Sequence, residues 1–242
     1  MAPPSRAEDL ALERRLSGSG AAQTQGNADA LYADRQHLES AQRAAAIWSA
    51  DLARNPRAYE TAWKLSRAEY WLGGHAPELD RRGLLERGVE TARAAVALEP
   101  THPEGHFWLA ANMGALAESF GMRQGIKFRR PIKDELDAVL RIDPSFEHGS
   151  ADRAIGRWYF RVPRLFGGSR ALSEQHLKAS LRYDPEGTAS HFFLAELFLD
   201  DGRTSEARAE LRKTIDARGY PEWAPEDSEF RERARQLLKS LK

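Results

Sequence analysis

The chain of 242 residues contains no cysteine. This absence excludes disulfide bonds, thiolate metal ligands and a cysteine nucleophile. It leaves the compartment open, because exported proteins can also lack cysteine. No apolar run approaches the roughly 18 residues that a membrane-spanning helix needs, so we expect no membrane span. The N-terminal segment lacks an apolar core and carries acidic residues, so we expect that it is not an intact signal peptide.

The sequence also lacks an excess of either charge. Lys and Arg together number 36, as do Asp and Glu, so the formal net charge is zero. Without a global field to attract polyanions, we expect no nucleic-acid partner. Strands are missing from the pattern as well, because no stretch alternates with period two for long enough to form a sheet. From residue 28 onward the periodicity is helical, which predicts an all-α fold.

A short phrase recurs four times along the chain. An alanine is followed six residues later by a proline, and an aliphatic residue lies two positions after each alanine. Because proline cannot continue a helix and moves the residue before it out of the α region, each copy predicts a helix end. The spacing of 41–44 residues between the prolines is typical of stacked helical hairpins. The four copies are Ala50–Pro56, Ala94–Pro100, Ala138–Pro144 and Ala179–Pro185.

Two aromatic phrases share one position in the repeat. The sequence HFWLA begins at His106, six residues after Pro100, and HFFLA begins at His191, six residues after Pro185. The shared offset predicts a structural role for both histidines at the start of a hairpin's first helix. Together with the prolines it predicts a right-handed α-solenoid of about five hairpins.

The pattern divides the chain into three parts. Residues 1–28, rich in Ala, Ser, Gly and Gln, are expected to form a flexible N-terminal arm. Residues 29–218 form the solenoid, and residues 219–242 form a turn and a helix that caps its open end. Residues 120–133 are expected to be the main irregularity, a long turn within the third hairpin.

The fifth hairpin resembles a tetratricopeptide repeat (TPR). Ala195, Gly202, Ala207 and Leu211 match the family's small residue, turn, second small residue and large residue. The family's usual repeat is about 34 residues, so the present hairpins are elongated. The resemblance implies a helical scaffold that binds partners.

A longer resemblance covers residues 58–215. It is carried by GRWYFRVP at 156–163, LFGGS at 165–169 and FWLAAN at 107–112. These runs are similar to the bacterial tetratricopeptide protein that accompanies some TRAP transporters, the T-component, and to regulator-of-microtubule-dynamics domains. The resemblance implies a non-enzymatic periplasmic protein, its signal removed, that partners a solute-binding protein and handles a small organic ligand. Members are commonly lipoproteins anchored through a cysteine, which this chain lacks; without the transporter association we expect a cytoplasmic protein.

Three arginines provide the sharpest candidate site. Arg153, Arg157 and Arg161 are four residues apart, which places them on one helix face that points into the concave groove. Guanidinium groups bind carboxylates, such as a partner's acidic segment or an organic acid. The alternative is that these arginines pair with acids on neighbouring helices or are simply solvated. The full set that we expect to line the groove is Arg67, Tyr70, Asn112, Arg153, Arg157, Tyr159, Arg161 and Glu196.

A second basic cluster falls within the irregular segment. Lys127, Arg129, Arg130 and Lys133 are predicted to lie on an exposed loop, where a scaffold commonly displays binding residues. Ordinary solvation of these charges is the alternative.

The sequence offers little that would support catalysis. His102 and His106 are four residues apart, but Pro103 interrupts the helix between them and the phrase is not the HExxH motif of zinc proteases. We therefore expect no metal, no cofactor and no enzymatic activity. An enzyme that uses the His102/His106 region is the least favoured alternative.

These observations predict a non-catalytic scaffold. Its concave groove would hold a partner protein, a peptide or a small anionic ligand, in association with a TRAP-type transport system if the resemblance extends to function. Two alternatives stay open: a self-assembling subunit whose oligomer encloses a ligand path, and a generic TPR adaptor unrelated to transport.

Overall fold

The computed structural model describes residues 26–241, and this part of the chain is helical, with no strand among those residues. The predicted all-α fold is therefore confirmed. Residues 26–33 form a helical segment, while the rest of the expected arm at 1–28 lies outside the described residues. The α-helices that follow are α2 (Leu38–Arg54), α3 (Tyr59–His75), α4 (Glu78–Leu98), α5 (Pro103–Ser119), α6 (Met122–Ile142), α7 (Phe146–Arg161), α8 (Arg170–Tyr183), α9 (Thr188–Asp200), α10 (Thr204–Asp216) and α11 (Ala224–Ser240).

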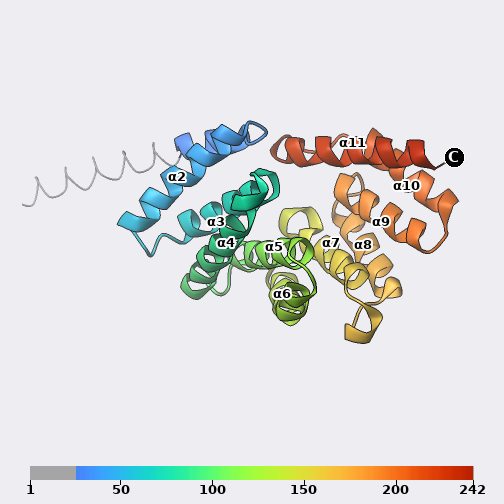
Figure 1. Ribbon diagram of the computed structural model, residues 1–242, viewed down its shortest axis with the longest axis horizontal. Coiled ribbons are helices and arrows are strands. Elements are labelled where there is room, and N and C mark those ends of the chain that lie inside the picture. The colour runs from blue at the N-terminus through green and yellow to red at the C-terminus, as the bar shows by residue number, and fades with distance from the viewer. Residues whose placement is uncertain (1–25, 242) are drawn as a thin grey trace, which may run out of the picture.

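The helices pack as consecutive hairpins. Helix α3 pairs with α4, α5 with α6, α7 with α8, and α9 with α10, and segment 26–33 precedes α2 in the first hairpin. The first helices α3, α5, α7 and α9 also contact one another in turn, so they form the inner row of a curved array (Figure 1). The solenoid of about five hairpins is thus confirmed.

The recurring prolines mark the hairpin boundaries as expected. Helices α2, α4, α6 and α8 each end two residues before a repeat proline, and the C-cap residue directly before the proline has a non-helical ψ of 77–98°. The proline ring excludes the α conformation at the preceding position, so the helix ends for a local, covalent reason. The four residues are Asn55, Glu99, Asp143 and Asp184.

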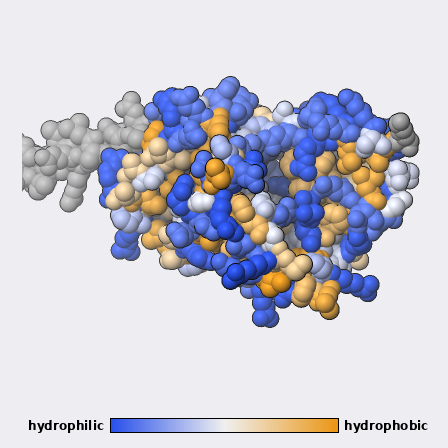
Figure 2. All heavy atoms as spheres, in the orientation of Figure 1, coloured by the Kyte–Doolittle hydropathy of each residue, from blue (hydrophilic) through white to orange (hydrophobic). Residues whose placement is uncertain are grey.

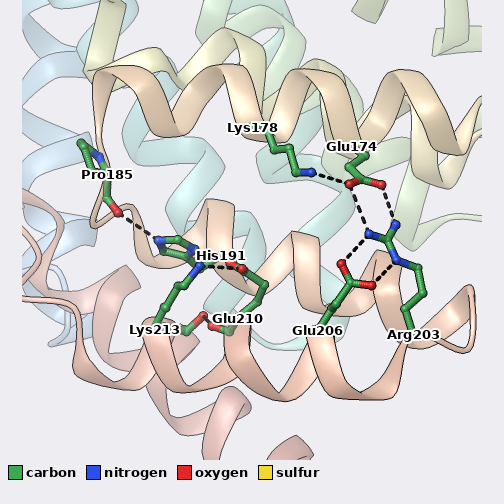
Figure 3. Close-up of polar contacts among 9 residues, drawn as sticks. Glu174, Lys178, Pro185, His191, Arg203, Glu206, Glu210 and Lys213 are labelled. Atoms are coloured by element: carbon green, nitrogen blue, oxygen red, sulfur yellow. Dashed lines mark hydrogen bonds and ion pairs between the residues drawn. The ribbon is translucent and has the colours of Figure 1, made fainter.

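The repeated histidine joins three segments of each hairpin in which it occurs. The Nε2 atom of His191 lies 3.0 Å from the carbonyl oxygen of Pro185, and its Nδ1 atom contacts Glu210 of α10 (Figure 3). The residue thereby ties the start of α9 to the preceding boundary and to its partner helix. His106 makes the equivalent pair of contacts, with Pro100 and Glu135.

The segment at 120–133 differs from the expected long turn. Helix α6 begins at Met122 and continues through Pro131, so the third hairpin is lengthened by helix. A proline inside a helix removes one backbone donor and crowds the carbonyl four residues earlier, at a cost of about 3 kcal/mol. The buried side chains of Phe128, Ile132 and Leu136 on both sides of Pro131 offset this cost. The basic cluster at 127–133 therefore lies on a helix and not on a loop.

Helix α11 is the predicted cap. It packs against α9 and α10, where the Phe230 ring lies 5.5 Å from the rings of both Phe192 and Phe193. Within residues 26–241, neither this helix nor any other is long and apolar enough to cross a membrane.

The cap also reaches the opposite end of the array. Figure 1 shows α11 lying across the open side of the arc, with its first turn beside the loop that precedes α2. Arg35 of that loop, only 3% exposed, donates from Nε to Glu226 Oε1 at 2.9 Å and also donates to the Glu222 carbonyl. His75 Nε2 lies 2.7 Å from Glu229 Oε1. These five residues, which we name the clasp, close the solenoid into a ring.

Candidate functional site: the central cavity

The closed ring surrounds a cavity of about 770 Å³, which we name the central cavity. Figure 2 shows a hollow near the middle of the molecule, between its N-terminal and C-terminal halves. A volume of this size falls in the range of small-molecule sites, roughly 300–1,000 Å³. The wall comes mainly from α5, α6, α7, α9 and α11. Its larger apolar side chains include Phe107, Trp108, Ile132, Trp158, Phe193, Trp223 and Phe230.

Two of the three α7 arginines in this wall are neutralised. Arg157 Nε lies 3.1 Å from Glu118 Oε1 at the end of α5, and its Nη1 pairs with Glu196 of α9. Arg161 Nε lies 3.5 Å from the same Glu118 atom. Burial would lower the pKa of Arg157, but the two carboxylates outweigh it and raise that pKa. Both arginines are thus held by acids of neighbouring inner helices.

The third arginine has no such partner. Arg153 lines the cavity, is half-buried, and forms no ion pair or hydrogen bond with any residue between 26 and 241. Its burial lowers the pKa of the guanidinium, although Asp184 and Glu147 act from a distance in the opposite direction. A desolvated charge without a counter-ion is costly to keep. Arg153 is therefore available to an anion that enters the cavity.

Two uncharged donors belong to the same wall. Trp108 is 3% exposed, and its buried Nε1–H finds no acceptor in the described part of the chain. The Tyr70 ring lies 5.7 Å from the Trp108 ring, and desolvation raises the pKa of its hydroxyl, which stays protonated at neutral pH. Buried donors are nearly always satisfied in proteins, so the Trp108 N–H, which has almost no accessible surface, is an exception among the described residues.

The first turn of α7 has an unusual backbone. Glu147, His148 and Gly149 have φ values of 46°, 58° and 77°, which are left-handed. Two of these residues are not glycine, and such strain clusters at functional sites. Glu147 lines the cavity, and no described residue forms a hydrogen bond or ion pair with its carboxylate. Burial raises the pKa of Glu147.

The eight groove residues expected from the sequence separate in the structure. Tyr70, Arg153, Arg157 and Arg161 line the cavity, and Glu196 reaches it through its pair with Arg157. The remaining three lie elsewhere, as described next.

Asn112 is fully buried between α5 and α3, where its Nδ2 donates to the Ser66 carbonyl at 3.2 Å. Tyr159 stacks on His176 of α8. Arg67 lies over the Tyr32 ring, 4.2 Å from its centroid. None of the three is part of the cavity wall.

The four residues of the basic cluster do not converge on a shared site. Arg129 lines the cavity and its guanidinium lies 5.4 Å from the Phe166 ring. Lys133 pairs with Asp137 at 2.7 Å, while Lys127 lies over Phe128. Arg130 is exposed on α6.

The sequence reasoning missed several residues that prove central to the cavity. Glu118 and Glu147 gave no motif. Trp108 has a position in the repeat that favours packing between hairpins, with a partial role in lining a ligand cavity as the alternative. A signal for Glu147 was present in the adjoining Gly149, because a glycine next to the start of a helix can mark a left-handed turn.

Metal-ligating residues do not gather in the described part of the chain, where no three His, Asp or Glu side chains could hold an ion. His106 is engaged by Glu135 and Pro100, and the His102 ring lies against Tyr59 with 5.2 Å between centroids. The pair therefore does not form a common site.

Comparison with solved structures shows the same fold elsewhere. The crystal structure of TTC0263, a thermophilic TPR protein of Thermus thermophilus, is similar with a TM-score of 0.67 and 24% identity, over 88% of this chain and 98% of that one. A crystal structure of MamA matches with a TM-score of 0.49 and 15% identity, over 81% and 94% of the two chains. No curated protein sequence matches this chain.

The family comparison covers the part of the chain that supplies most of the inner row. The family model described as regulator of microtubule dynamics protein 1-3 matches residues 26–175, from the first helical segment into α8. The match includes α5 and α7, which carry Trp108 and Arg153. Because it covers more than half of the chain, the protein belongs to the regulator of microtubule dynamics protein 1-3 family.

Proposed function

We propose that this protein is a non-catalytic binding scaffold whose central cavity holds a small organic anion with an apolar part. The observation that carries the proposal is Arg153, an unpaired guanidinium in a largely apolar wall. A carboxylate accepts two parallel hydrogen bonds from a guanidinium, which makes such pairs strong in a water-poor cavity. The apolar wall then supplies affinity for the rest of the ligand.

Closure within one chain favours this function over the oligomeric alternative. The clasp joins the two ends of the solenoid, so a second copy is not needed to enclose the cavity. We expect a monomer in size-exclusion chromatography with light scattering at every concentration. A stable oligomer would favour the self-assembling subunit instead.

The resemblance to T-components suggests a biological setting. In that setting the protein works in the periplasm and exchanges its ligand with the solute-binding protein of a TRAP-type transporter. Genes for a TRAP permease and a binding protein beside this gene would support the association. Other neighbours would favour a generic adaptor unrelated to transport.

The direct test compares a carboxylate with its matched alcohol. Trp108, Trp158 and Trp223 line the cavity and report on its occupancy through their fluorescence. We expect 4-phenylbutyrate to bind about tenfold more tightly than 4-phenylbutanol, since a charge-assisted pair contributes about 1.4 kcal/mol or more. Replacement Arg153→Gln should abolish this preference.

Arg161→Gln is the matched control, because that guanidinium already faces Glu118. It should retain the preference for the carboxylate. Equal binding of the two probes to the wild type, or a preference that survives Arg153→Gln, would contradict the proposed function.

A further inference from the structure

The central cavity contains two unpaired charges of opposite sign. Arg153 and Glu147 both line it and both come from α7. Each influences the pKa of the other from a distance, yet they form no ion pair with one another or with any other residue of the described chain. Two such charges would normally be expected to pair, so their separation needs a structural cause.

The backbone supplies that cause. Residues six apart on a regular helix lie on different faces, and here the left-handed turn redirects the earlier residue. A Cβ at Gly149 would lie 3.1 Å from the Ser180 carbonyl, so α7 meets α8 closely at this turn. The ring of His148 stacks on Tyr220 at 4.1 Å. Packing from both sides therefore holds Glu147 in place, at the expense of backbone strain.

Other charged side chains of the wall already have partners. Asp227 accepts from Thr188 and from the backbone N–H of Tyr220, and Glu226 is held by Arg35 in the clasp. Arg233 lies 3.7 Å from Glu196. Asp184 accepts the backbone N–H of Glu186 at 3.2 Å. Within the described residues, Glu147 is thus the carboxylate of the wall that has neither a hydrogen bond nor an ion pair, and Arg153 is the guanidinium that has neither of these nor, unlike Arg129, a facing aromatic ring.

We propose that the ligand is an apolar zwitterion, with its carboxylate on Arg153 and its protonated amine on Glu147. This inference rests on the proposed function. A ligand with one charge would leave the opposite charge of the cavity unpaired and desolvated, whereas a zwitterion satisfies both. The Tyr70 hydroxyl in the same wall supplies a further donor to the carboxylate. A cavity of about 770 Å³ accommodates a molecule of the size of a di- or tripeptide.

The test uses one dipeptide and its two blocked forms. Phenylalanyl-phenylalanine carries both charges, its N-acetyl derivative lacks the amine, and its amide lacks the carboxylate. We expect the free dipeptide to bind about tenfold more tightly than either blocked form, by tryptophan fluorescence and by calorimetry. Glu147→Gln should make the free and acetylated peptides equal, and Arg153→Gln should make the free peptide and the amide equal. Arg161→Gln should change neither comparison.

The outcomes separate this inference from the function on which it rests. If the acetylated peptide binds the wild type as tightly as the free one and Glu147→Gln changes nothing, the zwitterion is overturned while the anion site stands. If neither 4-phenylbutyrate nor any of the peptides binds, both proposals fail. Should Glu147→Gln fail to fold, the three peptides on the wild type decide alone.

Discussion

Three arginines on one face of α7 show how neighbours determine what a residue does. Arg157 and Arg161 face Glu118, and Arg157 is also held by Glu196, whereas Arg153 faces the cavity without a described partner. Chemically identical side chains are thus paired with acids in two cases and left without a described partner in the third, where we propose that a ligand binds.

Replacement of the unpaired arginine should stabilise the empty protein. Arg153→Met removes a desolvated charge and keeps most of the apolar stem, so we expect a higher melting temperature. Each kcal/mol gained corresponds to about 2–4 °C in a protein of this size. Arg157→Met is the matched control and should lower the melting temperature, because Glu118 and Glu196 lose their partner. Scanning calorimetry measures the melting temperatures of the two variants. An equal decrease in both would show that Arg153 stabilises the fold as Arg157 does.

A buried carboxyl outside the cavity predicts a pH effect. Burial raises the pKa of Glu69 to about 7, although a hydrogen bond from Thr91 and the charge of Arg87 act against it. The Glu69 carboxyl ionises near pH 4.5 in the unfolded chain and near pH 7 in the folded protein. The contribution of protonated Glu69 to the free energy of unfolding is therefore complete below pH 4.5 and is lost as the pH rises through 7. The loss amounts to roughly 3 kcal/mol.

Glu69→Gln should remove this component, so that urea unfolding between pH 5 and 8 shows a flatter profile than in the wild type. The variant should also be the more stable protein at pH 8. A slope unchanged by the substitution would show that other groups carry the pH dependence.

Within a hairpin, the spacing of two helices depends on small residues. Ser173 Oγ of α8 donates to the Gly156 carbonyl of α7 at 2.8 Å, which requires close approach of the two backbones. A Cβ at Gly156 would lie 2.7 Å from Leu177 Cγ and 3.1 Å from the Leu177 backbone nitrogen. The contact with the Leu177 side chain can relax by rotation of that side chain. The contact with the Leu177 backbone nitrogen can relax only if α8 itself moves.

Gly156→Ala should therefore destabilise the protein by about 1–3 kcal/mol, even though alanine is the better helix former. Gly114→Ala in α5 is the control, because a Cβ at Gly114 would meet nothing within 4 Å. This substitution should leave stability unchanged or raise it. Chemical denaturation of the two variants measures the difference. A stabilising Gly156→Ala would mean that α7 and α8 can separate without cost.

At the scale of the whole molecule, the clasp converts an open solenoid into a ring. Arg35 and Glu226 are 191 positions apart in sequence and bind each other. His75 contributes on the same edge, where it stacks on Trp71 and contacts Glu229. The clasp therefore joins the two ends of the described solenoid across the open side of the arc.

Closure should weaken as pH rises. Burial opposes protonation of His75, but its hydrogen bonds to Glu229 and to the Trp71 carbonyl outweigh burial and raise its pKa above 6.5. Its contribution is full below pH 6.5 and is lost as pH rises through the raised value. Because the chain has no cysteine, spin labels at introduced cysteines replacing Gln36 and Glu232 can report the distance between the two ends.

We expect a longer or broader label distance at pH 8 than at pH 6. Arg35→Ala should broaden it at both values, and His75→Gln should remove the difference between them. A distance that is the same in all three proteins would show that the ends stay together without the clasp.

The sequence by itself determined the hairpin boundaries, the shared position of His106 and His191, and the capping helix. These features depend on local causes, since a proline ring acts on the residue beside it and a repeated side chain meets repeated neighbours. Tertiary structure alone decided which arginine is unpaired, because Glu118 and Glu196 each lie 39 residues from Arg157. It also decided the left-handed turn at Glu147 and the return of α11 to Arg35. Electrostatic pairing and ring closure depend on distances in space, which a linear pattern of residue types does not encode.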